Sequence, residues 1–351
     1  MGSMDPSERK RRILAAIVEL YNATGEPVGS KRLMEVLPDE VSSATIRNEM
    51  AQLAELGFLE QPHTSAGRIP SPRGYRYYID NLLPLRELSN EQRMQLEEEL
   101  RARAKEPEHL LESAGKLLAE LTACTALCMP AGGEQVRVRR IEIAPLGRSM
   151  AMLALLSTGG AVKSKVIRTD APLTPEALEA FARLAKEQML GMPLASFTQA
   201  GLQSLAAKAG AQFWAVAPLL AGVAELAEAA AGGEMLVGES NLYRHPQLEH
   251  NSRALLEYLQ SAGLSQLIRR EQRLPPEPPQ SIRVLLGGES PAHPPALQGA
   301  TLVIAPYVTG GAQGGLLGVV GPLRMDYAKV IPGLRFIAAL LGKILDKGLD
   351  E

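Results

Sequence analysis

Three helical patterns followed by an extended ribbon, all within the first eighty residues, constrain the fold more strongly than any other feature. Asp5-Pro6-Ser7-Glu8 places a capping side chain, a proline at the first helical position and an acidic residue three positions after the cap. Apolar residues at helical spacing follow, up to a glycine that predicts the end of this helix. We expect a second helix over residues 30–38 and a third that opens at Ser42 or Ser43 and ends at Gly57.

The extended ribbon comes directly after the third predicted helix. Residues 58–61 and 68–70 have strand-like composition, and they flank the turn region His63-Thr64-Ser65-Ala66-Gly67. This pattern predicts two short strands joined by a flexible tip. Three helices followed by a β-ribbon is the order of a winged helix-turn-helix domain, which presents one helix to the major groove of DNA.

The distribution of charge limits how such a domain could attract DNA. The chain has 37 basic and 39 acidic side chains, so its formal net charge of −2 provides no long-range attraction to phosphate. The first eighty residues hold ten Lys/Arg and eleven Asp/Glu. Residues 61–79, however, contain no acidic side chain, and Arg68, Arg73 and Arg76 bring three positive charges there. Local basicity therefore occurs where a DNA-binding surface needs it.

Length and composition exclude several other classes of protein. A chain of 351 residues corresponds to two or three domains of roughly 150 residues, and 46% hydrophobic with 22% charged residues is typical of a soluble folded protein. Two cysteines argue against a disulfide framework and for a reducing cytoplasm. The most apolar run, Ala209–Ala224, is interrupted by Gly210, Gln212, Pro218 and Gly222. We therefore expect a cytoplasmic protein that has no membrane partner.

The remainder of the chain alternates between helical and strand patterns. Residues 85–122 are helical in period, and the three segments Val136–Ile143, Met150–Leu156 and Val162–Thr169 predict an antiparallel meander. An alanine-rich helical middle follows. A proline cluster at residues 275–279 marks a boundary, after which strands and a final helix resume. This order predicts one α+β domain interrupted by an inserted one.

The third predicted helix carries the candidate base-reading residues. If this helix buries its apolar residues, about 100° of rotation per residue places Ala44, Arg47 and Asn48 on the outward face. Arginine can bind O6 and N7 of guanine, asparagine can pair with adenine, and a small alanine allows close approach to a thymine methyl group. The alternative is an ordinary solvated helix face, but the capped helix and the acid-free ribbon favour DNA. We predict a recognition surface of five residues: Ser43, Ala44, Thr45, Arg47 and Asn48.

The ribbon provides a second candidate DNA contact. We expect Arg68 to enter a minor groove or meet a phosphate, while Thr64, Ser65 and the Gly67 amide donate hydrogen bonds to the DNA backbone. His63 could join them. The alternative for the ribbon is a mobile hairpin with a solvated imidazole.

Three further features have plain structural interpretations. The tyrosines among residues 75–78 are expected to pack, at least two of them in the core. Cys124 and Cys128 are spaced like two ligands on a helix, but no partner ligands lie near, so we interpret them as buried apolar residues. Gly310–Gly315 lacks the Gly-Lys-Ser/Thr ending of a phosphate loop and predicts a hairpin. No motif indicates catalysis, a cofactor or a metal.

Several segments closely resemble the family of heat-inducible transcription repressors called HrcA. The amino-terminal segments are Glu26–Lys31, Val41–Met50 and Gln61–Pro70. Near the C-terminus, Ala305-Pro306-Tyr307 and Gly321–Tyr327 resemble a second sequence signature of that family. Gly238–Leu242 resembles a weaker, central one. The resemblance covers nearly the whole chain.

The resemblance implies a multidomain α+β protein with three parts. These are a winged helix over 1–84, a discontinuous GAF-like domain over 85–173 and 276–351 that includes a connecting helix at 85–106, and an inserted, mainly helical dimerising domain over 174–275. It also implies a homodimer that binds an inverted-repeat operator upstream of chaperone operons, with activity aided by the GroE chaperonin. Two-fold protein symmetry matched to a two-fold operator is the physical reason for dimerisation.

A regulator from another class remains as the alternative. In such a protein a winged helix is joined to a C-terminal enzyme or metabolite sensor, which would need a nucleotide loop or a convergent polar pocket. The sequence contains neither feature. We therefore expect a repressor that is not an enzyme, as the resemblance implies.

Overall fold

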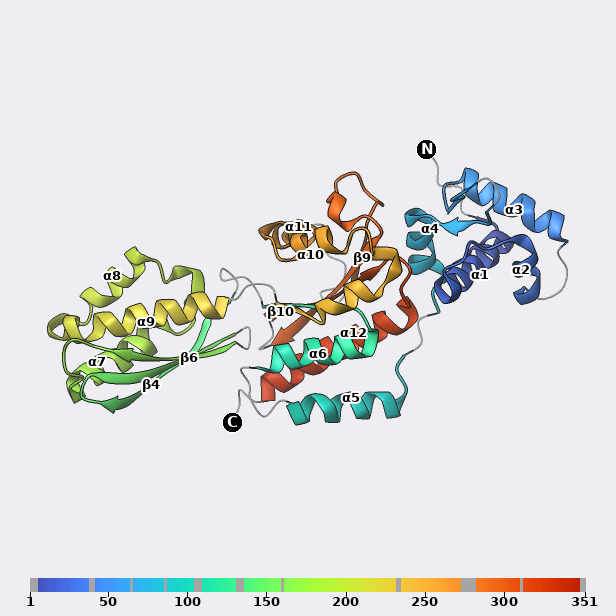
Figure 1. Ribbon diagram of the computed structural model, residues 1–351. Coiled ribbons are helices and arrows are strands. Elements are labelled where there is room, and N and C mark those ends of the chain that lie inside the picture. Colours follow the sequence, from blue (N-terminus) through green and yellow to red (C-terminus); the bar gives the residue numbers. More distant parts are fainter. Residues whose placement is uncertain are drawn as a thin grey trace.

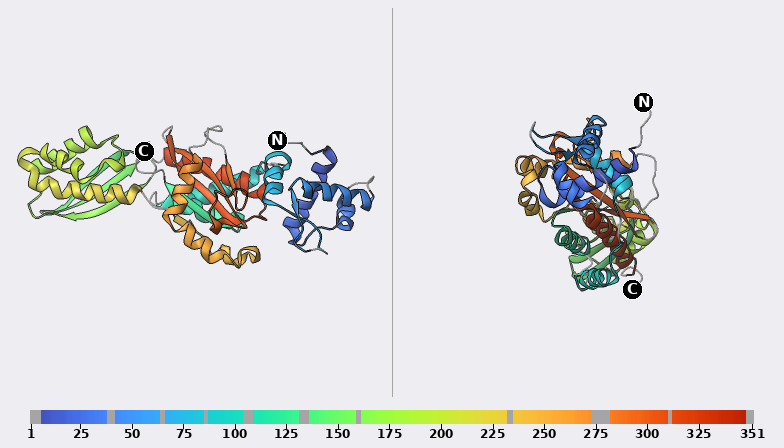
Figure 2. Two further views of the ribbon diagram at one scale, coloured as in Figure 1. Left: turned by 90° about the horizontal axis from the view of Figure 1, so that it is seen from above. Right: turned by 90° about the vertical axis from the view of Figure 1, so that its right-hand side faces the viewer.

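The computed structural model describes residues 6–37, 42–63, 66–84, 87–103, 109–130, 136–158, 161–231, 235–272, 282–309 and 312–347. The molecule is elongated, with a small helical body at the N-terminal end, a sheet-centred body in the middle and a second sheet with its own helices at the far end (Figures 1 and 2). It is a mixed α+β protein, as predicted.

The N-terminal body has the predicted order of three helices and a ribbon. Its elements are α1 (Glu8–Thr24), α2 (Ser30–Val36), α3 (Ser43–Glu55), β1 (Leu59–Glu60), β2 (Ile69–Pro70) and α4 (Pro72–Tyr77), which continues as a π-helical turn over Tyr78–Leu82. The helix ends follow from capping. The Ser42 hydroxyl accepts a hydrogen bond from the Thr45 amide, and Gly25 ends α1 in the left-handed conformation. The cap of α1 is Ser7, so this helix begins two residues later than the Asp5 cap predicts.

The middle body is built on a five-stranded antiparallel sheet with the order β7-β3-β10-β9-β8. Its strands are β3 (Thr125–Pro130), β7 (Met235–Val237), β8 (Arg283–Leu286), β9 (Ala300–Thr309) and β10 (Ala312–Pro322). Its helices are α5 (Asn90–Arg103), α6 (Leu110–Thr122), α10 (Ser252–Leu259), α11 (Ala262–Gln272) and α12 (Tyr327–Lys347). Apolar side chains of α6 and α12 cover one face and those of α10 and α11 cover the other, giving two hydrophobic clusters. The predicted hairpin at Gly310–Gly315 is confirmed by the antiparallel pairing of β9 and β10.

The far body combines a three-stranded meander with three helices. The strands are β4 (Val138–Gly147), β5 (Met150–Ser157) and β6 (Val162–Arg168), and the helices are α7 (Pro175–Leu184), α8 (Gln199–Ala207) and α9 (Phe213–Ala231). The strands pair in the antiparallel order β4-β5-β6, which confirms the predicted meander. Leu153, Phe181 and Val216 bring strand and helix side chains into one buried cluster.

Helix α9 is the one candidate membrane span among the described helices. Together with the turn before it, Gly210–Ala231 is long and apolar enough to cross a membrane by length and composition, with a mean hydropathy of 1.4. Half of its most apolar 18-residue stretch is buried inside the protein. Gly222 lies so close to Ile167 of β6 that a Cβ atom there would meet its side chain at 2.6 Å. This is the packing of a core helix against its sheet.

The structure divides the C-terminal part differently from the predicted domain bounds. The meander over 138–168 was expected in the GAF-like domain, yet it shares its core with α7 and α9. Conversely, β7 and α10, which fall within the predicted insert, pair or pack with the five-stranded sheet. The reason is long-range pairing: β3 finds its partners in β7 and β10, whereas β4 pairs with its neighbour along the chain. The elements of the far body, β4 to α9, therefore all lie between β3 and β7 along the chain.

Candidate nucleic-acid interface

Helix α3 presents three of the predicted residues to solvent. Ile46, Met50 and Leu53 are buried against the rest of the N-terminal body. The opposite side of the same helix carries a short polar stripe made of Ala44, Arg47 and Asn48, all of which are exposed. The helix therefore has one buried face and one exposed face, as the spacing of its apolar residues predicts.

The first turn of α3 is held by hydroxyl groups. The Ser43 hydroxyl lies 3.0 Å from that of Ser30 at the start of α2, and the Arg47 Nε donates to the same Ser30 oxygen at 3.3 Å. Thr45 lies 3.0 Å from the Ser42 hydroxyl. Ser43 and Thr45 are only half-buried, but their hydroxyls already have protein partners. The structure thus gives Ser43 a role in fixing α2 to α3 and Thr45 a role in the N-terminal cap of α3, both of which sequence reasoning missed.

An acidic side chain next to this stripe is neutralised by helix α1. Glu49 is largely buried, and its carboxylate lies 3.1 Å from the Lys10 ammonium and 3.8 Å from the Arg9 guanidinium. The pairing removes a negative charge that would repel phosphate beside the exposed stripe. The spacing between α1 and α3 in the sequence gives no sign of this contact.

The ribbon is anchored to the loop before α2. The backbones of Val28 and Arg68 exchange two hydrogen bonds of 2.9 Å, which add a third short extended segment to β1 and β2. At Gly67 a Cβ atom would lie 2.5 Å from the Val28 carbonyl, so only glycine allows this approach. Gly67 and Arg68 are half-buried and His63 is exposed. Of the predicted contacts of the ribbon, Thr64 and Ser65 lie outside the described residues.

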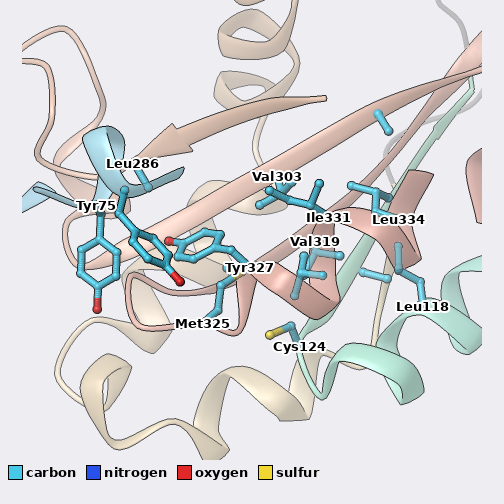
Figure 3. Close-up of a cluster of buried hydrophobic side chains, with 14 of the residues drawn as sticks. Tyr75, Leu118, Cys124, Leu286, Val303, Val319, Met325, Tyr327, Ile331 and Leu334 are labelled. Atoms are coloured by element: carbon cyan, nitrogen blue, oxygen red, sulfur yellow. The ribbon is translucent and has the colours of Figure 1, made fainter. Parts of the chain in front are cut away.

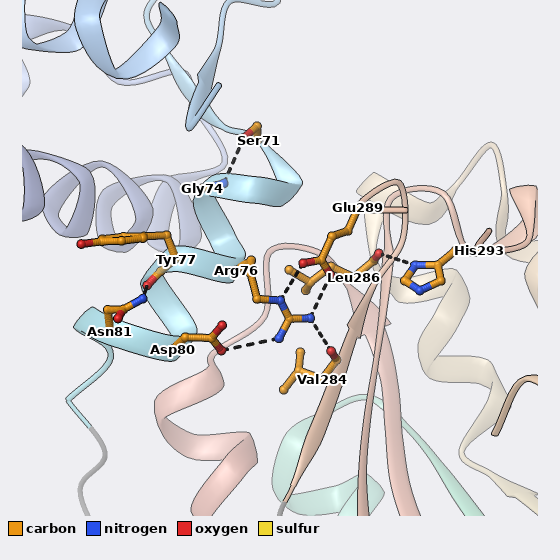
Figure 4. Close-up of polar contacts among 10 residues, drawn as sticks. All are labelled: Ser71, Gly74, Arg76, Tyr77, Asp80, Asn81, Val284, Leu286, Glu289 and His293. Carbon is orange, nitrogen blue, oxygen red and sulfur yellow. Dashed lines mark hydrogen bonds and ion pairs between the residues drawn. The ribbon is translucent and has the colours of Figure 1, made fainter. Parts of the chain in front are cut away.

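The three arginines of residues 61–79 have separate roles. Arg73 is exposed and its guanidinium lies 5.1 Å from the centre of the Phe58 ring. Arg76 instead points to the middle body, where it forms an ion pair with Glu289 (Figure 4). The expectation that all three arginines contribute to a DNA-facing surface is therefore wrong for Arg76. The local charge pattern could not reveal a partner so distant in the chain.

The remaining predicted features are structural. Tyr75 and Tyr78 are buried, which confirms that at least two of the three tyrosines pack in the core. Cys124 follows α6 and Cys128 lies in β3, both buried, so they are not spaced along a helix. Burial raises the pKa of Cys124 to about 11 and that of Cys128 to about 12. Within the described residues, no group of three or more His, Cys, Asp or Glu could hold a metal ion.

Comparison with known proteins gives the same picture for both halves of the chain. A family model described as the winged helix-turn-helix transcription repressor, HrcA DNA-binding, matches residues 5–79. A second, described as the HrcA protein C terminal domain, matches residues 108–331. These matches cover the N-terminal body and most of the two bodies that follow it.

Full-length relatives and a solved structure are similar over almost the whole chain. The heat-inducible transcription repressor HrcA of Shouchella clausii is 33% identical over 328 residues, which is 93% of this chain and 94% of the relative. The protein of the same name from Desulforudis audaxviator is 33% identical over 346 residues, 98% of this chain and 99% of the relative. A crystal structure of a hypothetical protein covers 98% of this chain and 99% of its own, with a TM-score of 0.70 and 24% identity, and shares the fold.

Proposed function

The chain belongs to the HrcA family of heat-inducible transcription repressors, and we propose that it represses chaperone operons as a homodimer bound to an inverted-repeat operator. The observation that carries this proposal is the exposed stripe of Ala44, Arg47 and Asn48 on a helix whose other face is sealed. An arginine, an asparagine and a small side chain on adjacent turns are the side chains that read base edges in a major groove.

Each residue of the stripe has a specific task in this proposal. Arg47 binds O6 and N7 of a guanine, Asn48 pairs with N6 and N7 of an adenine, and Ala44 lies against a thymine methyl group. The hydrogen bond from the Arg47 Nε to Ser30 holds the stem of that side chain. Ser43 and Thr45 approach the DNA at the N-terminus of α3, where backbone amides and the helix dipole favour a phosphate.

The ribbon supplies contacts that do not depend on sequence. We propose that Arg68 reaches a phosphate or the minor groove, and that His63, Thr64, Ser65 and the Gly67 amide bond to the DNA backbone. The pairing of Arg68 with Val28 supports this, because it fixes the start of β2 to the loop that precedes α2. Phosphate contacts of this kind supply affinity and register, while α3 supplies the choice of sequence.

The far body offers a surface for the second copy of the chain. Helices α7 to α9 cover one face of the β4-β5-β6 sheet. On the other face the register places Val166 beside Met152, and these side chains are 50% and 40% exposed. The same face carries Arg140 and Glu142 at its β4 edge. We propose that this exposed, mixed face lies at the interface of the homodimer, because interfaces combine an apolar centre with a polar rim.

The middle body is the candidate GAF-like domain, and we propose no catalytic role for it. We propose a cytoplasmic location, in keeping with a soluble transcription repressor. The GAF-like assignment rests on the family and on the helices that cover both faces of the five-stranded sheet.

Titration of DNA tests the central part of the proposed function. The full-length protein should bind a duplex that carries the inverted repeat from upstream of the chaperone operon more tightly than a scrambled duplex of the same composition. Affinity for both should fall as salt increases, because phosphate contacts release counterions. Sedimentation of the protein alone and on DNA should give a dimer. Equal affinity for the two duplexes would reject sequence-specific repression.

We propose that activity depends on the GroE chaperonin, and the topology of the middle body supports this proposal. Cys128 of β3 pairs with Leu317 of β10, so this sheet closes only after the whole inserted body has been made. Pairing across such a separation is slow and leaves apolar strands exposed in the meantime. We expect the GroE chaperonin with ATP to raise the yield of DNA-binding protein after dilution from denaturant at physiological temperature. Equal yields with and without the chaperonin would contradict this expectation.

A further inference from the structure

The winged helix is joined to the middle body by a continuous apolar cluster and, at its edge, by polar and aromatic contacts far from the exposed stripe of α3. One set of contacts involves Arg76, on α4, and the loop between β8 and β9 (Figure 4). A second set involves α1 and Tyr75 on one side and residues 323–327, which precede and open α12, on the other. Figure 3 shows Tyr75 beside Tyr327 and Met325. Neither set touches the exposed stripe of α3.

All three nitrogens of the Arg76 guanidinium contact an acceptor. Its Nε donates to Glu289 Oε1 at 2.7 Å, and one terminal nitrogen donates to Glu289 Oε2 at 2.8 Å and to the Val284 carbonyl at 2.5 Å. The other terminal nitrogen lies 3.5 Å from Asp80. The Arg76 and Glu289 side chains are 29% and 26% exposed, so this bidentate pair is partly shielded from solvent. Such geometry fixes direction as well as distance between two domains.

Buried aromatic residues lie beside the ion pair. The rings of Tyr75 and Tyr327 are 6.1 Å apart, and both side chains are almost fully buried. The Tyr75 hydroxyl donates to Asn22 at 2.7 Å, and the Asn22 amide donates to the Met325 carbonyl at 3.2 Å. The hydrogen-bond chain therefore runs from α4 through α1 into the middle body.

The position of α4 is transmitted to the recognition helix through close backbone packing. At Gly74 a Cβ atom would lie 2.1 Å from the Phe58 carbonyl, so α4 lies directly against the backbone that leads into β1. The Phe58 amide in turn bonds to the Leu53 carbonyl at the end of α3. A rotation of α4 relative to the middle body would therefore move α3 as well.

We propose that Arg76 and Glu289 are positioning residues that set the angle at which α3 is presented, and hence the spacing between the two recognition helices of a dimer. This inference rests on the proposed function for its effect on DNA, since it concerns how two half-sites are matched. Half-sites on one face of the duplex are separated by about one helical turn, roughly 34 Å, so a fixed angle is needed for both helices to engage together.

Variants of the full chain in which the charges at positions 76 and 289 are reversed, singly and together, test the proposal. We compare Arg76→Glu, Glu289→Arg and the double variant, each on the inverted repeat, on a single half-site, and on repeats with the spacer changed by a base pair or two. Each single variant should lose about tenfold or more in affinity for the natural repeat, keep the half-site affinity and lose the preference for spacer length. The double variant restores an ion pair between positions 76 and 289 but not the hydrogen bond to the Val284 carbonyl, so it should regain part of both the affinity and the preference.

A measurement without DNA separates this inference from the proposed function. Probes are attached at Met34→Cys on α2 and Tyr243→Cys on the middle body, where the native side chains are 48% and 58% exposed and both natural cysteines are buried. The distance distribution should be narrow in the otherwise native chain, broad in Arg76→Glu and narrower in the double variant than in Arg76→Glu. Labelled protein is diluted with unlabelled protein so that distances within one chain dominate.

The matched control is Arg253→Glu, which breaks an exposed ion pair with Glu257 on α10. It should change neither the distances nor the spacer preference, because exposed pairs contribute little. A narrow distribution in Arg76→Glu, or a double variant that stays as broad as the single ones, would overturn the inference. If the distances behave as expected but the native protein does not prefer the inverted repeat, the proposed function fails and the positioning contact stands.

Discussion

Replacing Arg47 or Asn48 with alanine is expected to abolish most of the preference for the inverted repeat over a scrambled duplex. Each side chain is assigned a bidentate contact to a base, and such contacts contribute about 1–3 kcal/mol of discrimination. A homodimer makes each contact twice, so one substitution removes about 2–6 kcal/mol, most of the difference between specific and non-specific binding. The measurement is a titration of both duplexes at several salt concentrations.

Two other variants show that the effect belongs to the exposed stripe. Glu55→Ala changes an exposed residue at the far end of the same helix and should leave discrimination intact. Arg68→Ala should weaken binding to both duplexes alike and reduce the slope of log K against log salt by about 1 per arginine lost, because its contact is to phosphate. If Arg47→Ala and Asn48→Ala both discriminate like the native protein, α3 does not read the bases.

Phe181→Ala is expected to unfold the far body selectively. Phe181 is fully buried in the cluster that joins the β4-β5-β6 sheet to its helices, and truncation of a buried phenylalanine costs about 3–5 kcal/mol. This cluster is separate from the other two, one of which joins the N-terminal body to the middle body while the second lies in the middle body alone. The loss should therefore appear as a new transition at lower temperature in calorimetry. Loss of the homodimer, with half-site binding retained, should accompany it.

An exposed aromatic residue of the same body provides the control for Phe181. Trp214, on α9, is 78% exposed, so Trp214→Ala should change stability by no more than about 0.5 kcal/mol. A single transition that shifts as a whole in Phe181→Ala would show that the three clusters unfold together. A stable dimer above the melting temperature of the far body would contradict its proposed role in association.

The N-terminal domain could be predicted from sequence because its signals are local. Caps, glycine stops and apolar residues at helical spacing all act within a few positions, and they place α1, α2 and α3 close to their observed bounds. The outward position of Arg47 follows from helical geometry alone. The inward use of the Ser43 hydroxyl does not, because it depends on Ser30 in another helix.

Domain bounds and distant partners could not be predicted in the same way. The strand patterns of β3 and β4 predict strands, but nothing in their periodicity says that β3 pairs with β10 and β4 with β5. Likewise, the charge of Arg76 suggests a DNA contact until the fold brings Glu289 to it from the other end of the chain. Local patterns determine elements, whereas these features arise from contacts of long sequence separation.

Disulfide trapping on DNA tests most directly whether α3 lies in the major groove. Both natural cysteines are buried, so a cysteine introduced at Ala44 supplies an accessible thiol that can react with a base carrying a thiol tether in one half-site. The account predicts a cross-link from Ala44→Cys at one or two adjacent base positions and none from Glu55→Cys. Failure of Ala44→Cys to cross-link at every position of a repeat that the protein demonstrably binds would contradict it.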